Sequence, residues 1–230
     1  MLVLTWNLYH GRRIVEGPGP STIGDHLAEF REAIAGWEWN VALLQEVPPW
    51  WPAELARAAG AQERTALTSR NLGLWLRRPI AQRRPDLIKS NGGGANAVLV
   101  RGEIAEHRTR RLRWWPERRV VHAVRLGDGT WVGNLHAQVH SEERAQADIG
   151  VSAETVRAWS RGAPFVVGGD LNVRVPVAAG LLHAGGHGVD HVLCSGFEPA
   201  GQDVPDRGVL SDHAPVIVEL REGTGAQRRQ

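Results

Sequence analysis

The chain has 230 residues, 42% of them apolar, which suits one large globular domain with a substantial core. Its formal net charge is only +2, and Lys89 is the sole lysine among many arginines. Arginine binds phosphate bidentately, although a genome that favours arginine codons explains the same bias equally well. The single cysteine, Cys194, excludes an internal disulfide framework and a thiolate metal site, and its apolar neighbours favour a core thiol.

The sequence shows no charged-then-apolar leader and no long uninterrupted apolar segment. We therefore expect a cytoplasmic protein without a membrane span, and a monomer. No internal repeat or linker is visible, so we expect a single domain over residues 1–221. Residues 222–230 are expected to form a disordered tail.

Short apolar runs predict most of the secondary structure in the first half of the chain. A helix is expected from Ser21 or Thr22 to Trp37, where apolar residues recur at spacings of three and four, and a shorter helix at 52–59. The expected strands are 2–6, 41–44, 72–76 and 96–100. Residues 91–94 are expected to form a loop.

The second half is also rich in short strands. Two apolar runs, 120–126 and 130–135, flank a Gly-Asp-Gly turn and predict a hairpin. Residues 141–160 are expected to be helical. Further strands are expected at 165–167, 189–193 and 216–218. Many strands with few helices between them favour packed sheets flanked by helices.

Several of these strands end in side chains that can bind a metal ion or move a proton. Their ligating atoms are oxygens and imidazole nitrogens, which suit Mg²⁺ or Mn²⁺ and acid–base chemistry near neutral pH. Phosphoester hydrolysis needs such a set: a metal for the phosphate oxygens, a base for water, and donors for the transition state. The residues are Asn7, Glu46, His136, Asp170, Asn172, Asp190, Asp212 and His213.

Seven short motifs occur in one order along the chain: Thr5-Trp6-Asn7, Leu44-Gln45-Glu46-Val47, Asn96-Ala97-Val98-Leu99, Asn134-Leu135-His136, Gly169-Asp170-Leu171-Asn172, Val189-Asp190-His191-Val192-Leu193 and Ser211-Asp212-His213-Ala214-Pro215. Together they resemble the endonuclease/exonuclease/phosphatase family, also called DNase-I-like, over residues 2–220. The resemblance implies an α/β fold, a four-layer α/β/β/α sandwich of two mostly antiparallel sheets flanked by helices. It also implies Mg²⁺-dependent hydrolysis of phosphodiester bonds, with Mn²⁺ as another possible cofactor and nucleic acid as the expected substrate.

The resemblance implies a metal site built from three residues. Glu46 is the expected principal ligand, with Asn7 beside it, and Asp212 is expected to assist the metal or its waters. Asn7 as a turn residue and Glu46 as an exposed strand terminus are the structural alternatives.

Five residues carry expected catalytic roles in this resemblance. Asp170 would orient or deprotonate the attacking water, and Asn172 would bond to the phosphate and to Asp170. Asp190 would accept a hydrogen bond from His213, which would contact the scissile phosphate. His136 would assist the leaving group. A satisfied structural histidine at 136, or a turn-capping aspartate at 190, is the alternative.

Three residues are expected to contact substrate outside this centre. Asn96 stands where DNase-I-like enzymes can offer a carboxylate to their second histidine, so we expect it to orient that histidine or a phosphate. Arg113 and Trp114 belong to the segment 108–119, in which arginines can neutralise phosphates and indoles can stack on unpaired bases. A solvated rim is the alternative for that segment.

Two other functions stay open. The segment between Asn172 and Asp190 is short, which argues against specific recognition of duplex DNA and allows a phosphatase or phosphodiesterase acting on a small or lipid-linked phosphoester. A non-catalytic binding module is disfavoured, because a degenerate site would be expected to have lost at least one member of the set.

Overall fold

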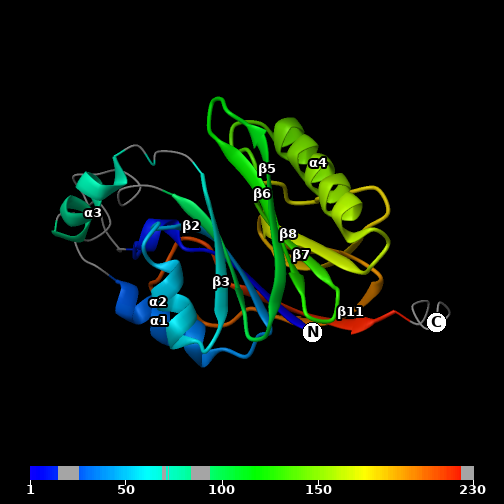
Figure 1. The fold of residues 1–230 in the computed structure, drawn as a ribbon, viewed down its shortest axis with the longest axis horizontal. Helices are drawn as coiled ribbons and strands as arrows, with labels where there is room; N and C mark the ends of the chain where they lie inside the picture. The colour runs from blue at the N-terminus through cyan, green and yellow to red at the C-terminus, as the bar shows by residue number, and fades with distance from the viewer. Residues whose placement is uncertain (15–25, 69–70, 72, 84–93, 224–230) are drawn as a thin grey trace.

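Two six-stranded sheets pack face to face in the computed structural model, which describes residues 1–14, 26–68, 71, 73–83 and 94–223 (Figure 1). The strands of the first sheet are β1 (Leu2–Asn7), β2 (Val41–Val47), β3 (Gln62–Leu67), β4 (Ala95–Val100), β11 (Phe197–Asp203) and β12 (Val216–Glu222). The strands of the second are β5 (Ile104–Arg113), β6 (Arg119–Leu126), β7 (Trp131–His136), β8 (Phe165–Asp170), β9 (Leu182–His187) and β10 (Asp190–Ser195).

The strand order is β11-β12-β1-β2-β4-β3 in the first sheet and β5-β6-β7-β8-β10-β9 in the second. Only β1–β2 and β7–β8 pair in parallel among the described strands, and every other pair is antiparallel. The four strands β1, β2, β7 and β8 all finish at one end of the sandwich, because Asn7 of β1 meets Asp170 of β8 and Gln45 of β2 meets Asn134 of β7.

Helices cover the two outer faces (Figure 1). The helices are α1 (Leu27–Gly36), α2 (Pro52–Ala58), α3 (Leu74–Arg83) and α4 (Glu142–Ser160), with a 3-10 turn, η1 (Tyr9–Gly11). The first sheet is covered by α1 and α2, where Phe30 of α1 packs on Trp6 with ring centroids 5.0 Å apart. The second sheet is covered by α4, which buries Ile149 and Val156. The four-layer α/β/β/α prediction is therefore confirmed, and no helix in the described ranges is both long and apolar enough to cross a bilayer.

The strand expected at 72–76 is wrong, because residues 74–76 begin the helix α3, while Leu72 lies outside the described residues. Its apparent alternation does not correspond to one buried face, since the neighbouring side chains of Trp75 and Leu76 are both exposed. The first sheet has β3 at one of its two edges. This strand has a partner on one side only, and Ala66 is its one buried residue, so its sequence carries little hydrophobic signal.

Four strands have no counterpart among the expected elements: β3, β5, β9 and β11. All four lie at sheet edges. Two of them, β9 and β11, are largely exposed and rich in glycine or polar residues, which hides their strand character.

Some expectations lie partly outside the described residues. The expected helix start at Ser21 or Thr22 and the loop residues 91–93 lie there, and the described part of that helix begins at Leu27. The final strand, β12, runs to Glu222, and residues 224–230 of the expected tail are also outside the described ranges.

Gly169, next to the end of β8, offers a test of how closely β7 and β8 approach. Its φ is 139°, and an added Cβ would lie 1.9 Å from the carbonyl oxygen of Leu135. Gly169→Ala should therefore lower the free energy of unfolding by about 2–4 kcal/mol, because backbone must move to relieve the clash. In α4, where a Cβ at Gly150 would meet nothing within 4 Å, Gly150→Ala should be neutral or stabilising by up to about 1 kcal/mol. Urea unfolding measures both variants, and an unchanged midpoint for Gly169→Ala would contradict the packing described here.

Candidate active site

The layer between the sheets is apolar at one end and polar at the other. Side chains alternate along a strand, so the face of β1 that buries Val3 also carries Asn7, and the face of β8 that buries Val166 also carries Asp170. The polar members lie where β1, β2, β7 and β8 finish. We call this end of the sandwich the site end. The buried polar residues gathered there are Asn7, Gln45, Asn96, Asn134, His136, Asp170 and Asp190.

Hydrogen bonds between amides join the two sheets beneath the site. Gln45 Nε2 of β2 donates to Asn134 Oδ1 of β7 at 2.8 Å. The Asn134 amide donates in turn to the carbonyls of Leu44 and Ala97, both at 2.9 Å. These buried bonds fix the relative position of the strand ends that carry the site.

Asp170 lies at the centre of the polar cluster. Its Oδ2 accepts a hydrogen bond from Asn7 Nδ2 at 2.9 Å and lies 3.3 Å from His136 Nε2. Its Oδ1 accepts the backbone N–H of Asn172 at 3.2 Å, and the Asn172 side chain donates to the carbonyl of Ala137 at 3.1 Å. The two sheets thus contribute to the environment of one buried carboxyl group.

His213 and Asp190 form a hydrogen-bonded pair beside Asp170. His213 Nδ1 lies 2.7 Å from Asp190 Oδ2, and its Nε2 lies 3.9 Å from Asp170 Oδ2. The other oxygen of Asp190, Oδ1, is buried and has no partner among the described residues. The pair therefore turns Nε2 of His213 toward Asp170.

The turn that carries His213 is fixed by its neighbours. Ser211 has a left-handed backbone with φ 61°, and its hydroxyl donates to the carbonyl of Asn7 at 2.6 Å. Trp6 Nε1 donates to the carbonyl of His213 at 3.0 Å. The turn is thereby attached to the end of β1, where Asn7 lies.

Glu46 reaches the cluster through an irregularity in β2. The register between β2 and β4 shifts between Leu44 and Val47, and Glu46 has φ 51°. Its Oε2 lies 2.9 Å from His10 Nε2, and its Oε1 lies 3.9 Å from His136 Nε2. His10 has no expected role in the sequence, although its place three residues after Asn7, in the same loop, is a usable signal. Its φ of 53° is also left-handed.

The remaining expected residues are placed differently. Asp212 is exposed, with its Oδ1 3.9 Å from His213 Nε2. Asn96 is fully buried in β4, and neither its amide nitrogen nor its amide oxygen has a partner in the described part of the chain. Arg113 pairs with Asp148 of α4 at 2.6 Å. Trp114 is exposed on the β5–β6 loop, with the guanidinium of Arg111 3.7 Å from its ring centroid.

Arg119 is a buried cation that the sequence did not single out as part of the site. It begins β6, pairs with Glu117 at 2.6 Å, and its Nε lacks a partner among the described residues. Burial lowers the pKa of Arg119, and the nearby carboxylates of Glu117, Asp170 and Glu46 oppose that effect. A fixed positive charge thus lies close enough to act on the cluster.

The environment separates the protonation states of the carboxyl groups. Burial raises the pKa of Asp170 to about 7, and the nearby carboxylate of Asp190 adds to this effect. Burial also acts on Glu46, but the hydrogen bond and charge of His10 outweigh it and hold the pKa of Glu46 well below its usual value. Glu46 is therefore ionised at neutral pH, while Asp170 exchanges its proton there.

The pKa values of the two histidines also differ. Burial, reinforced by the positive charge of Arg119, holds the pKa of His136 well below its usual value. Burial alone would lower the pKa of His213, but the hydrogen bond and charge of Asp190 raise it to about 9. His136 is thus neutral and His213 protonated near pH 7.

The donor set fits a divalent cation. Carboxylate and amide oxygens from Glu46, Asn7 and Asp212 are the ligands that Mg²⁺ and Mn²⁺ take, and Glu46 is ionised without a metal. Asp170, Asp190 and His213 also bring ligating atoms within 4.8 Å of one another. The buried Oδ1 of Asp190, which lacks a partner in the described part of the protein, is consistent with a bound cation or water.

Comparison with known proteins agrees with this geometry. A family model described as Endonuclease/Exonuclease/phosphatase family matches residues 4–213. The chain belongs to the endonuclease/exonuclease/phosphatase family. The family comprises phosphoric ester hydrolases that are typically dependent on a divalent metal. A search by sequence among curated proteins found no match.

Solved structures share the fold at low sequence identity. An endonuclease/exonuclease/phosphatase from Beutenbergia cavernae DSM 12333 is 21% identical with a TM-score of 0.67, covering 96% of this chain and 71% of its own. TDP2 from Caenorhabditis elegans is 17% identical with a TM-score of 0.65, covering 94% and 73%. The human Nocturnin catalytic domain is 16% identical with a TM-score of 0.67, covering 97% and 93%. The family architecture therefore extends over nearly the whole chain.

The His213–Asp190 pair yields a pH prediction for the metal-free protein. The pKa of His213 is about 9 in the folded protein and about 6.5 in the unfolded chain. The pair therefore contributes its full stabilisation of the folded state below pH 6.5. That contribution, on the order of 3 kcal/mol, is lost as the pH rises through 9. Asp190→Asn should bring the pKa of His213 to 7 or lower, as followed by NMR of its imidazole protons.

Asp203→Asn, which removes an exposed carboxylate at the last residue of β11, is the control and should leave the pKa of His213 unchanged. An unchanged His213 titration in Asp190→Asn would mean that the pair does not form in solution. Denaturant titrations at both pH limits give the matching difference in free energy of unfolding.

Proposed function

We propose that this protein is a Mg²⁺- or Mn²⁺-dependent phosphodiesterase. Glu46 would be the principal metal ligand, with Asn7 beside it and Asp212 contributing to the metal or its waters. When bound, the cation would neutralise phosphate oxygens and make the phosphorus a better electrophile. Family membership and the oxygen-rich donor set support this proposal.

The observation that carries the proposal is the environment of Asp170. Its carboxyl group has a pKa of about 7, so it is able to accept a proton from water near neutral pH. Hydrogen bonds from Asn7 and from the backbone of Asn172 hold the carboxyl in one orientation. A general base needs both the matched pKa and the fixed position.

His213 would stabilise the charge that develops on the phosphate. Protonated at neutral pH and held by Asp190, it presents Nε2 on the side of Asp170. A prepositioned cationic donor stabilises the pentacovalent transition state more than the ground state. Asn172, which lies beside Asp170, would add a hydrogen bond to the phosphate.

The chemical step is then an in-line displacement. A water oxygen bonds to phosphorus as one of its protons passes to Asp170, and the bond between phosphorus and the leaving oxygen breaks. His136, kept neutral by burial, would hydrogen-bond to the leaving oxygen, which takes up a proton from solvent water to leave as an alcohol, while Asp170 returns its proton to solvent. Asn96, buried in β4, would orient His136 or a phosphate.

The polymer specificity is less strongly supported than the chemistry. Arg113 and Trp114, the residues expected to contact nucleic acid outside the centre, are engaged with Asp148 and Arg111 respectively. Nucleic acid stays a prediction for the substrate, alongside a small or lipid-linked phosphoester.

Loss of the proposed base or metal ligand should abolish most of the activity. Asp170→Asn and Glu46→Gln should each lower turnover of bis-p-nitrophenyl phosphate by about two to three orders of magnitude, with little change in the unfolding midpoint. Asp128→Asn, in the distant hairpin turn, keeps an acceptor for Thr130 and should retain full turnover. Chelation should stop hydrolysis by the unmodified protein, and Mg²⁺ or Mn²⁺ should restore it. Near-normal turnover in Asp170→Asn would refute the assignment of the base.

A further inference from the structure

Exposed apolar side chains are concentrated at the site end. Among the described residues, Val151 of α4 and Leu182 of β9 are the only large exposed apolar side chains outside it. The others lie on α3, on loops or at strand ends that reach the site end, where strand pairing places them. They are Ile14, Leu67, Trp75, Leu76, Ile80, Trp114, Trp115, Val139, Val175, Val177, Val204 and Val209.

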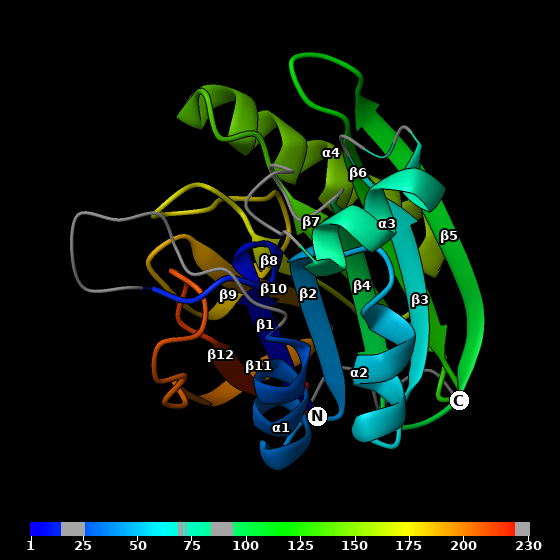
Figure 2. The same ribbon diagram turned by 90° about the vertical axis from the view of Figure 1, so that its left-hand side faces the viewer.

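Three tryptophans dominate this surface. Trp75 on α3 is 82% exposed, and Trp114 and Trp115 on the β5–β6 loop are 66% and 85% exposed. Figure 2 shows α3, the β5–β6 loop and the loop that follows β8 placed around the strand ends of the candidate site. Exposed apolar groups arranged around a site, rather than scattered singly, indicate a surface that binds something. We call this set the apolar rim.

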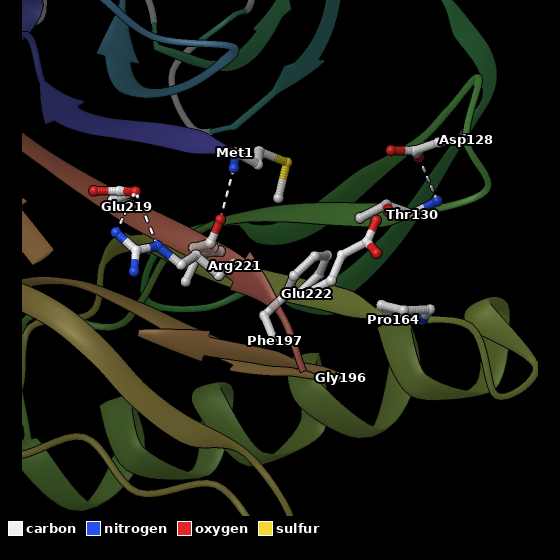
Figure 3. Close-up of a pocket in the computed structure, with 10 residues that line it drawn as sticks. Met1, Asp128, Thr130, Pro164, Gly196, Phe197, Glu219, Arg221 and Glu222 are labelled. Carbon is white, nitrogen blue, oxygen red and sulfur yellow. Dashed lines mark hydrogen bonds and ion pairs between the residues drawn. The ribbon is translucent and has the colours of Figure 1, made fainter. Parts of the chain in front are cut away.

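Arginines accompany the apolar rim. Exposed arginines lie at Arg78 in α3, Arg111 near the end of β5 and Arg174 next to Val175. The opposite end of the sandwich has a cavity of about 560 Å³ in which Asp128, Glu219 and Glu222 lie around the chain start at Met1 (Figure 3). The exposed arginines beside the apolar rim are the groups that would meet lipid phosphates on an anionic surface.

The chemistry of the rim favours lipid over nucleic acid. Base stacking requires flat aromatic faces, yet many rim residues are aliphatic, among them Leu76, Ile80 and Val177, which offer a base nothing to stack on. The ring of Trp114 already stacks with Arg111. Tryptophan, aliphatic residues and arginine together are typical of protein surfaces that enter the headgroup region of a bilayer.

We propose that the apolar rim docks the site end on an anionic phospholipid surface. Trp75 and Trp115 enter the interface, while Arg78 of α3 and Arg111 near the end of β5 contact lipid phosphates. In this position a phosphoester carried by a lipid reaches Asp170 and His213, a consequence that rests on the proposed function. Docking itself does not depend on catalysis.

The test is flotation of the unmodified protein with vesicles of phosphatidylcholine alone and of equal parts phosphatidylcholine and phosphatidylglycerol. We expect at least tenfold tighter partitioning to the anionic vesicles, and weaker partitioning as salt is raised, because screening shortens the range of the attraction. The Trp75→Ala/Trp115→Ala variant should bind about tenfold or more weakly, since two large apolar side chains no longer leave water. If the protein binds neither kind of vesicle, the proposal is overturned.

A control variant and a soluble substrate separate docking from folding and from catalysis. Val151→Ala/Leu182→Ala removes exposed apolar groups away from the site end and should leave vesicle binding unchanged. Both double variants should hydrolyse bis-p-nitrophenyl phosphate at the normal rate, so failure of hydrolysis in the unmodified protein would refute the proposed function and leave the docking result intact. Equal loss of binding in both double variants would count against the rim.

A second readout asks whether the tryptophans enter lipid. Phospholipids brominated on their acyl chains should quench tryptophan fluorescence in the unmodified protein and much less in Trp75→Ala/Trp115→Ala. A single-stranded oligonucleotide serves as the competing ligand. If it binds through the same two tryptophans while vesicles do not bind, the rim is a nucleic-acid surface and the proposal fails.

Discussion

The alternation of side chains across two packed sheets determines where chemistry is possible in this protein. A strand cannot turn a side chain to its other face without an irregularity, so the strands that build the inner apolar layer also point their last residues into it. At the site end those residues are polar, and a buried polar group must find a partner. Asn7 meets Asp170, and Gln45 meets Asn134, each across the gap between the sheets. One constraint thus produces both the core and the cluster.

Unusual backbone conformations are concentrated in the same place. Among described non-glycine residues, a left-handed backbone occurs at Tyr9, His10, Glu46, Asn172, Ser211 and Arg161. Arg161 simply ends α4, as helix termini often do. The other five lie at or beside the candidate site, where strained conformations persist because surrounding bonds hold them. The bond of Ser211 to Asn7 is one such restraint, and the contact of His10 with Glu46 is another.

The sequence was most informative where burial and motif coincided. The strands ending at Asn7, Glu46, His136 and Asp170 are buried, so their apolar runs predicted both the elements and the meeting of their polar ends. Edge strands such as β3 lack that signal because one side has no partner. His10 and Arg119 were missed because their roles arise from contacts between distant segments, which spacing does not reveal. The Asp190–His213 contact follows the family resemblance, whereas the monomeric state and the cytoplasmic location stay predictions.

Both sheets have a parallel pair of strands at the centre with an antiparallel strand on each side. The four central strands are β12, β1, β2 and β4 in the first sheet and β6, β7, β8 and β10 in the second. In the second sheet these strands occur in chain order, with only β9 between β8 and β10. In the first sheet β12 is made last, yet it pairs with β1, which is made first, and Met1 donates to the carbonyl of Leu220. During synthesis, therefore, β1 must wait for nearly the whole chain before its sheet is filled. His213 is delivered by the same late segment, so a nascent chain acquires its proposed catalytic histidine only when its fold closes.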